Sequence, residues 1–181
     1  MKQKLFTSIG LMSGTSMDGV DISIIQSDGQ YEFHNILDEY FEYDADLQAE
    51  LIRLRNLVLN QNDLLKNSEE LVNLERKITV FHAEKINHIL LEYKKEIDLI
   101  GFHGQTIFHN PQKKITKQLG DGKLLSQLVK KKVIYDFRQN DIKNGGQGAP
   151  LTPIFHYVLS KIINERFNTE FPIGFINIGG I

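Results

Sequence analysis

The first forty residues alternate between hydrophobic and polar positions as antiparallel strands do. Residues 4–11 form an apolar run, residues 20–26 are rich in β-branched side chains, and residues 31–41 alternate again. The intervals carry turn residues, Ser13-Gly-Thr-Ser-Met-Asp-Gly19 and Ser27-Asp-Gly-Gln30. Short runs bounded by Gly, Ser and Asp are typical of strands and hairpins. The sequence therefore predicts a three-stranded antiparallel meander.

The pattern then changes to a helical period. The first predicted helix has one apolar stripe: Leu47, Leu51, Leu54 and Val58. This spacing lies on one helix face, and Asp44 and Asp46 at the start complement the helix dipole. A second, longer helix is predicted over residues 62–93. Its predicted buried face consists of Leu71, Leu74, Ile78 and Phe81. Packing on the sheet is favoured over a coiled coil, because the stripe is short.

Strands and helices alternate in the rest of the chain. The predicted strands are residues 97–102, 115–119, 133–135 and 173–178. The predicted helices are residues 124–131 and 151–164. Such alternation after a meander indicates parallel strands added to the sheet, which is an α/β fold. Ligands of open α/β sheets gather at the carboxyl ends of the strands, where Gly-rich polar segments recur here.

Composition excludes several classes of protein. With 21 Lys and Arg against 23 Asp and Glu, the formal net charge is -2, which disfavours nucleic-acid binding. The chain has no Cys, so disulfides, thiolate-bound zinc and a cysteine nucleophile are excluded. No apolar run reaches the roughly 20 residues that span a bilayer, and the N-terminus resembles a strand more than a signal peptide. We therefore expect a cytoplasmic protein without a membrane partner.

The strongest local signal is Gly10-Leu-Met-Ser-Gly-Thr-Ser-Met-Asp-Gly-Val-Asp21. A Gly, Ser and Thr loop between two strands offers free N–H groups and hydroxyls that suit phosphate oxygens. Asp18 and Asp21 would then act through Mg2+ or its waters, because carboxylates repel phosphate. The alternative is a hairpin whose glycines serve only the turn. The segment is neither a Walker A loop nor a dinucleotide fingerprint.

Two further segments carry candidate chemistry. His103-Gly-Gln-Thr106 is predicted to follow a strand and suits sugar hydroxyls, whereas metal ligation lacks a third ligand. Arg138, in Asp136-Phe-Arg-Gln-Asn-Asp141, suits a carboxylate or phosphate. The alternative there is a helix N-cap by Asp141 and a weak Arg–Asp surface pair. A Gly-rich loop, residues 144–150, follows directly.

The remaining histidines on the long predicted helix point to no site. His82 and His88 are six residues apart, so they face away from each other. We interpret both as surface or packing residues.

Taken together, these segments resemble the anhydro-N-acetylmuramic acid kinase family. The matching motifs are residues 10–21, 103–106, 136–141, 145–156 and 177–180, in family order. The resemblance implies the first lobe of the ribonuclease-H-like fold that actin, sugar kinases and heat-shock chaperones share. It also implies that ATP and Mg2+ are used to phosphorylate the 6-oxygen of 1,6-anhydro-N-acetylmuramic acid while water opens the anhydro bridge. The product, N-acetylmuramic acid 6-phosphate, belongs to cell-wall recycling.

The resemblance also carries site residues over to this sequence. The ATP-binding residues that it implies are Gly14, Thr15, Ser16, Met17, Asp18, Gly19, Val20 and Asp21, with Asp18 as the metal candidate. The sugar-binding residues that it implies are His103, Gln105, Arg138 and Asp141.

Family members are roughly twice as long as this chain. We therefore expect residues 1–170 to be a first lobe and residues 171–181 to begin a second lobe that is otherwise missing. The family's general base would lie beyond Ile181, so no catalytic residue is assigned. Two hypotheses remain: a kinase completed by a second chain or a homo-oligomer, or a non-catalytic remnant that binds sugar or phosphate.

Overall fold

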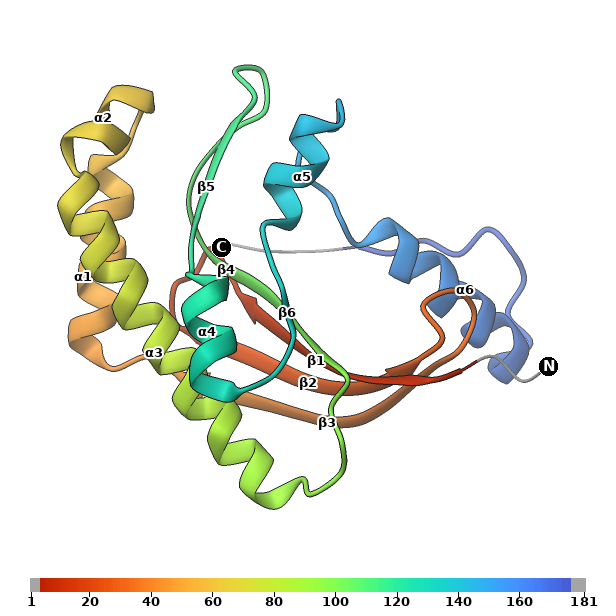
Figure 1. The fold of residues 1–181 in the computed structure, drawn as a ribbon. Coiled ribbons are helices and arrows are strands. Elements are labelled where there is room, and N and C mark those ends of the chain that lie inside the picture. Colours follow the sequence, from red (N-terminus) through yellow and green to blue (C-terminus); the bar gives the residue numbers. More distant parts are fainter. Residues whose placement is uncertain (1–3, 177–181) are drawn as a thin grey trace.

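The computed structural model describes residues 4–176, which are built around one six-stranded sheet. The strands are β1 (Phe6–Ser13), β2 (Gly19–Ser27), β3 (Phe33–Glu42), β4 (Leu99–Asn110), β5 (Ile115–Leu119) and β6 (Val133–Ile134). The helices are α1 (Ala45–Leu57), α2 (Gln61–Lys66), α3 (Ser68–Glu92), α4 (Gly122–Val129), α5 (Phe137–Lys143) and α6 (Pro153–Phe167). Figure 1 shows α1, α3 and α4 close together beside the strands, whereas α6 lies apart from them near the β2–β3 turn. None of the helices in the described part of the chain is long and apolar enough to cross a membrane.

The sheet has the predicted α/β topology. Strands β1, β2 and β3 pair antiparallel in sequence, which confirms the meander. Strand β4 then pairs parallel with β1, and β6 pairs parallel with β4. Strand β5 returns antiparallel along the second half of β4. The order β3-β2-β1-β4-β5 confirms the fold class that the resemblance implies.

The single helix predicted over residues 62–93 is wrong, because the structure has α2 and α3 there. Asn60 begins α2 with a capping box, in which Asn60 and Asp63 satisfy each other's backbone N–H groups. The α2 helix ends at Asn67, whose side-chain amide donates to the carbonyl oxygen of Asp63 at 2.7 Å. A local side-chain hydrogen bond of this kind competes with the helical pattern, and periodicity alone does not show it.

The predicted end of the strand at residue 102 is also wrong. Strand β4 continues to Asn110, so His103-Gly-Gln-Thr106 lies inside a strand and not after it. Pairing with β5 satisfies the backbone of this second half, and the register shifts near the motif on both neighbours. Of the strand predicted over residues 173–178, residues 173–176 are in no strand, and the remainder lies outside the described residues.

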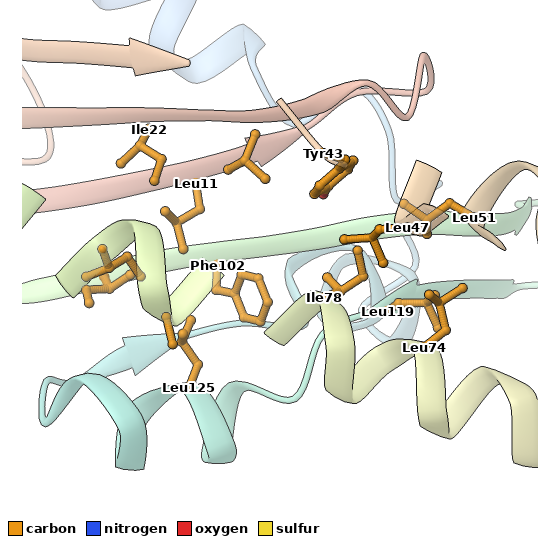
Figure 2. Packing of buried hydrophobic residues seen from close by; sticks show 14 of the residues in the cluster. Leu11, Ile22, Tyr43, Leu47, Leu51, Leu74, Ile78, Phe102, Leu119 and Leu125 are labelled. Carbon is orange, nitrogen blue, oxygen red and sulfur yellow. The ribbon is translucent and has the colours of Figure 1, made fainter. Parts of the chain in front are cut away.

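The core lies between the sheet and the helices α1, α3 and α4, as Figure 2 shows for a part of it. The predicted stripe of α1 is buried at Leu47, Leu51 and Leu54, and Asp44 caps that helix by accepting from the N–H of Leu47. From the sheet, the largest fully buried side chains include Ile9, Ile22, Ile24, Ile100 and Phe102. Burial of this apolar surface is the main favourable term in folding.

Among the buried polar contacts of this core is a chain of hydrogen bonds through His82. His82 of α3 is 0% exposed, and its Nδ1 lies 2.7 Å from the carbonyl oxygen of Ile78. Its Nε2 lies 3.3 Å from Oγ of Ser13, which in turn lies 3.0 Å from the hydroxyl of Tyr43. Burial lowers the pKa of His82 to about 4. His82 packs in the core, which confirms the prediction that it is a surface or packing residue. The sequence did not show that it also forms hydrogen bonds there.

We expect Leu51→Ala to lower the free energy of unfolding by about 3 kcal/mol, because the substitution leaves a cavity under a residue that is 0% exposed. Leu59→Ala is the matched control, since Leu59 is 76% exposed, and it should change stability by less than about 0.5 kcal/mol. Urea denaturation of both variants measures the difference. Equal effects would contradict the assignment of the core.

We also expect stability to fall on acidification because of His82. Its folded-state pKa of about 4 lies below the ordinary value of 6.5, so the unfolded chain binds more protons between these values. The contribution is fully present above pH 6.5 and is lost as pH falls towards 4, by about 2 kcal/mol at pH 4.5. Denaturation at pH 7 and 4.5 tests this.

His82→Gln should remove this part of the pH dependence, whereas His34→Gln, at an exposed position of β3, should keep it. Identical pH slopes for wild type and His82→Gln would show that His82 does not titrate as described.

Candidate functional site

The predicted phosphate-binding residues lie at the carboxyl end of β1. Gly14 to Asp18 form the loop that joins β1 to β2, whereas Gly19, Val20 and Asp21 are the first residues of β2. The loop stands beside the motif of β4, because Ser13 pairs with Gln105 across the parallel ladder. The structure therefore brings the two motifs together at the sheet edge where α/β folds bind ligands.

Two of these eight residues turn their side chains into the core. Met17 is 1% exposed, and Val20 is fully buried. Met17 has a φ of +58°, a conformation that costs a non-glycine residue energy and that its buried side chain offsets. Neither side chain reaches a ligand, so these two positions offer only backbone atoms.

The exposed part of the loop offers unpaired donors. Within residues 4–176, the N–H groups of Thr15 and Ser16 donate to no backbone acceptor, whereas the N–H of Met17 donates to the carbonyl oxygen of Gly14 at 3.3 Å. Both residues are exposed. Successive free N–H groups in a turn form a concave site that suits an anion. The backbone geometry thus fits phosphate oxygens.

The glycines of this loop have different roles. A Cβ on Gly19 would lie 2.4 Å from the carbonyl oxygen of Phe41 and 2.7 Å from the hydroxyl of Tyr40, so only glycine fits against β3. A Cβ on Gly14 would meet the hydroxyl of Ser16 at 3.2 Å, which a small shift relieves. Packing against β3 therefore accounts for Gly19, whereas close packing does not require Gly14.

The acidic residues gather on the same side of the hairpin. Asp18 accepts a hydrogen bond from the hydroxyl of Ser16 at 2.6 Å. Burial, and then the charges of Asp18, Glu42 and Asp21, raise the pKa of Tyr40. Among residues 4–176, no three His, Cys, Asp or Glu side chains are grouped to hold a metal ion. The donors fit a Mg2+ ion that keeps waters and phosphate oxygens as most of its ligands.

Gln105, one of the predicted sugar-binding residues, contacts the hairpin in the structure. It is 0% exposed, and its Nε2 donates to the carbonyl oxygen of Gly14 at 2.8 Å. Its Oε1 is buried and has no partner among the described residues. Gln105 therefore supports the loop from its buried side, through the carbonyl oxygen of Gly14.

His103 and Arg138 form the second cluster. Arg138 Nε donates to His103 Nε2 at 2.8 Å, and Arg138 Nη1 donates to the carbonyl oxygen of Gly148 at 2.6 Å. His103 Nδ1 lies 2.6 Å from the carbonyl oxygen of Gly104 and therefore carries the proton. Burial and then the charge of Arg138 lower the pKa of His103. The imidazole is neutral, and its orientation is fixed by both nitrogens.

Asp141 holds the same glycine loop from the other side. Its Oδ2 accepts from the N–H of Gly148 at 2.7 Å, and its backbone carbonyl accepts from the N–H of Gly146 at 2.9 Å. A Cβ on Gly146 would lie 2.1 Å from Oδ2 of Asp141, so glycine is required there. The N-cap alternative is wrong: Asp141 lies inside α5, and Asp136 occupies the N-cap position.

Three residues support the hairpin although the sequence analysis gave none of them that role: Ser13, which lies in the quoted motif, Tyr43 and His82. His82 had a usable signal, because it lies four positions after Ile78 on the apolar stripe of α3. Tyr43 had none, since its contact with Ser13 spans 30 positions of sequence.

Several grooves lie on the described surface, and two of them are larger than the others described here. One of about 770 Å³ follows α5 and includes Asp136, Asp141 and Leu151 in its lining. A larger one of about 880 Å³ lies between α1 and α3 and touches none of the predicted site residues. Of the predicted site residues, Asp141 lines the groove along α5, whereas His103, Gln105 and Arg138 do not.

Comparison with known proteins agrees with the motifs. A family model described as anhydro-N-acetylmuramic acid kinase matches residues 6–181. The chain is 55% identical over 179 residues to the anhydro-N-acetylmuramic acid kinase of Pelagibacter ubique, covering 99% of this chain and 47% of the relative. It is 41% identical to that of Agrobacterium fabrum, covering 97% and 47%, and 38% identical to that of Rhizobium etli, with the same coverage. The chain spans about half the length of these curated relatives, and it belongs to the anhydro-N-acetylmuramic acid kinase family.

Proposed function

We propose that this chain supplies the phosphate-binding hairpin and part of the sugar pocket of an ATP-dependent anhydro-N-acetylmuramic acid kinase. The observation that carries the proposal is the pair of N–H groups without a backbone acceptor at Thr15 and Ser16, two exposed residues of the loop beside the β4 motif. The reaction would convert 1,6-anhydro-N-acetylmuramic acid into N-acetylmuramic acid 6-phosphate, a step of cell-wall recycling. A cytoplasmic location goes with this proposal, because the donor is ATP.

In the proposed reaction, phosphoryl transfer depends on positioning and on neutralising charge more than on covalent chemistry. The γ-phosphoryl group passes to the 6-oxygen of the sugar, ADP leaves, and water adds to the anomeric carbon as the anhydro C–O bond breaks. The backbone of Thr15 and Ser16 would bind phosphate oxygens, and Asp18 with Asp21 would hold Mg2+ through its waters. The cation offsets phosphate charge that these carboxylates would otherwise repel.

The second cluster would bind the sugar. Arg138 has Nε and Nη1 engaged with His103 and Gly148, which leaves Nη2 for a carboxylate such as the lactyl group of a muramic sugar. His103, Arg138 and Asp141 would together fix the glycine loop against that ligand. Gln105 would contribute by supporting the hairpin.

We further propose that residues 1–170 act as one lobe and that residues 171–181 lead into a second. The relatives are about twice as long, and the chain covers 47% of them. The base that activates water and most of the adenosine-binding surface would come from that further half. A second polypeptide or a longer version of the chain would supply it.

We expect the 181-residue chain alone to give no turnover of ATP and 1,6-anhydro-N-acetylmuramic acid. Loss of a positioned base alone costs about 100- to 10,000-fold in rate. Adding the C-terminal half of the Pelagibacter ubique relative, as a fusion or a separate chain, should restore product formation. Mass spectrometric detection of the 6-phosphate measures it.

The competing hypothesis is a non-catalytic sugar- or phosphate-binding lobe, which the half-length match to the relatives also fits. That hypothesis predicts binding of the anhydro sugar but no turnover in either preparation. Turnover by the chain alone would exclude it, and absence of both binding and turnover would overturn the kinase proposal.

We expect Arg138→Lys, made in the fusion, to weaken sugar binding by about 10- to 100-fold. An ammonium group cannot donate to His103 Nε2 and the Gly148 carbonyl in the planar geometry of the guanidinium. Arg55→Lys, at an exposed position of α1, is the matched control and should bind normally. Calorimetry with the anhydro sugar measures the affinities, and equal values would remove Arg138 from the pocket.

A further inference from the structure

The loop of residues 13–18 is held at both ends by one residue outside it. The hydroxyl of Tyr43 lies 3.0 Å from Oγ of Ser13, at the start of the loop. The backbone N–H of Tyr43 donates to the carbonyl oxygen of Asp18 at 2.9 Å, at the end of the loop. Tyr43 thus connects the last residue of β1 with the last residue of the loop.

Tyr43 is itself fixed by its place in the chain. Strand β3 ends one residue before it at Glu42, and the N-cap of α1, Asp44, follows directly. Its ring is buried and packs edge-on against Phe81 of α3, with ring centroids 5.0 Å apart. The hydroxyl therefore has little freedom, and burial raises the pKa of Tyr43 to about 12.

The carbonyl group of Ile78 determines which atoms donate the hydrogen bonds among His82, Ser13 and Tyr43. The Ile78 carbonyl only accepts, so His82 Nδ1 carries a proton, and the neutral ring leaves Nε2 as an acceptor. Ser13 then donates its hydroxyl proton to His82, and Tyr43 donates to Ser13. A Ser–His pair of this kind resembles a nucleophile and base, but both residues are buried in the core, so it serves structure and not covalent chemistry.

The other contacts that hold the loop do not use the N–H groups of Thr15 and Ser16. Gln105 holds the carbonyl oxygen of Gly14, and the side chain of Met17 is buried in the core. These contacts use carbonyl oxygens and side chains, so the N–H groups of Thr15 and Ser16 stay available.

We propose that Tyr43 is a positioning residue for phosphate binding: through Ser13 and Asp18 it fixes the loop so that the free N–H groups of Thr15 and Ser16 converge on one anion. This inference rests on the proposed phosphate-binding role of the hairpin. It assigns to a residue outside every recognised motif an effect on phosphate affinity.

Tyr43→Phe tests the proposal, because it removes only the hydroxyl. Tyr93→Phe is the matched control: the Tyr93 ring also packs against the core, and its buried hydroxyl has no partner among the described residues. The full 181-residue chain is titrated with inorganic tripolyphosphate and Mg2+, which need no adenosine-binding surface. The amide signals of Thr15 and Ser16 report binding by nuclear magnetic resonance.

We expect wild type and Tyr93→Phe to bind equally and Tyr43→Phe to bind about tenfold more weakly, the loss expected for one buried hydrogen bond. Without ligand, the amides of Met17 and residue 43 should exchange with solvent about tenfold faster in Tyr43→Phe alone. Both measurements are made where denaturation shows every variant to be folded, so a general loss of stability does not imitate the result.

Ser13→Ala separates positioning through Ser13 from any other effect of the hydroxyl. If Tyr43 acts through Ser13, the double variant should bind no more weakly than the weaker of the two single variants. Unchanged affinity and exchange in Tyr43→Phe would overturn the inference while leaving the phosphate site intact. Absence of tripolyphosphate binding in wild type as well would instead overturn the proposed role of the hairpin, and the inference with it.

Discussion

The availability of two backbone N–H groups, at Thr15 and Ser16, is the constraint on which the rest of the site depends. A loop of small residues between strands ordinarily satisfies its own backbone or varies in conformation. Here the contacts that hold the loop engage its carbonyl oxygens and the side chains of Ser13 and Met17. Because those contacts lie on the core side, the outward donors are ordered without being used. The hydrophobic core and the candidate anion site are thus consequences of the same packing.

Strand β4 links the two halves of the site. Gly104 has a φ of +71°, and a Cβ there would lie 2.4 Å from the carbonyl oxygen of Leu119. The ladder to β1 shifts register beside this glycine. Gln105 consequently faces the hairpin under Gly14, whereas His103 meets Arg138. One irregular position in a strand therefore divides the motif between contact with the β1–β2 hairpin and contact with Arg138, which holds the glycine loop.

The elements that the sequence predicted well are those with a strong local period. The three strands of the meander and the stripe of α1 follow from alternation and from the spacing of leucines. The strand over residues 115–119 was also correct, and it decides the length of β4 by pairing with its second half. The end of β4 and the break at Asn67 were missed because a distant strand and a side-chain hydrogen bond determine them. Hydrophobic periodicity contains neither kind of information.

The site residues also divide into those that local motifs predicted and those whose positions depend on distant contacts. Motif spacing identified Gly14 to Asp21 and the His103 and Arg138 segments, and the structure places the start of the first segment beside Gln105 of β4 and Arg138 against His103 of β4. Spacing did not reveal that Met17 and Val20 face the core, that Gln105 lies under the hairpin, or that Tyr43 closes the loop. These facts depend on contacts between residues 30 to 91 positions apart.

The electrostatics of the hairpin explain why backbone donors are placed where they are. Asp18 puts negative charge beside Ser16, whose hydroxyl donates to it, and the charges of Asp18 and Asp21 both act on Tyr40. A bare phosphate would be repelled by these carboxylates, whereas a phosphate that carries a divalent cation would be attracted by both the N–H groups and the acids. In the proposed role of the hairpin, this arrangement would favour a metal-bound polyphosphate over a free anion. That preference would arise from the chain's own residues, and it is consistent with membership of a kinase family.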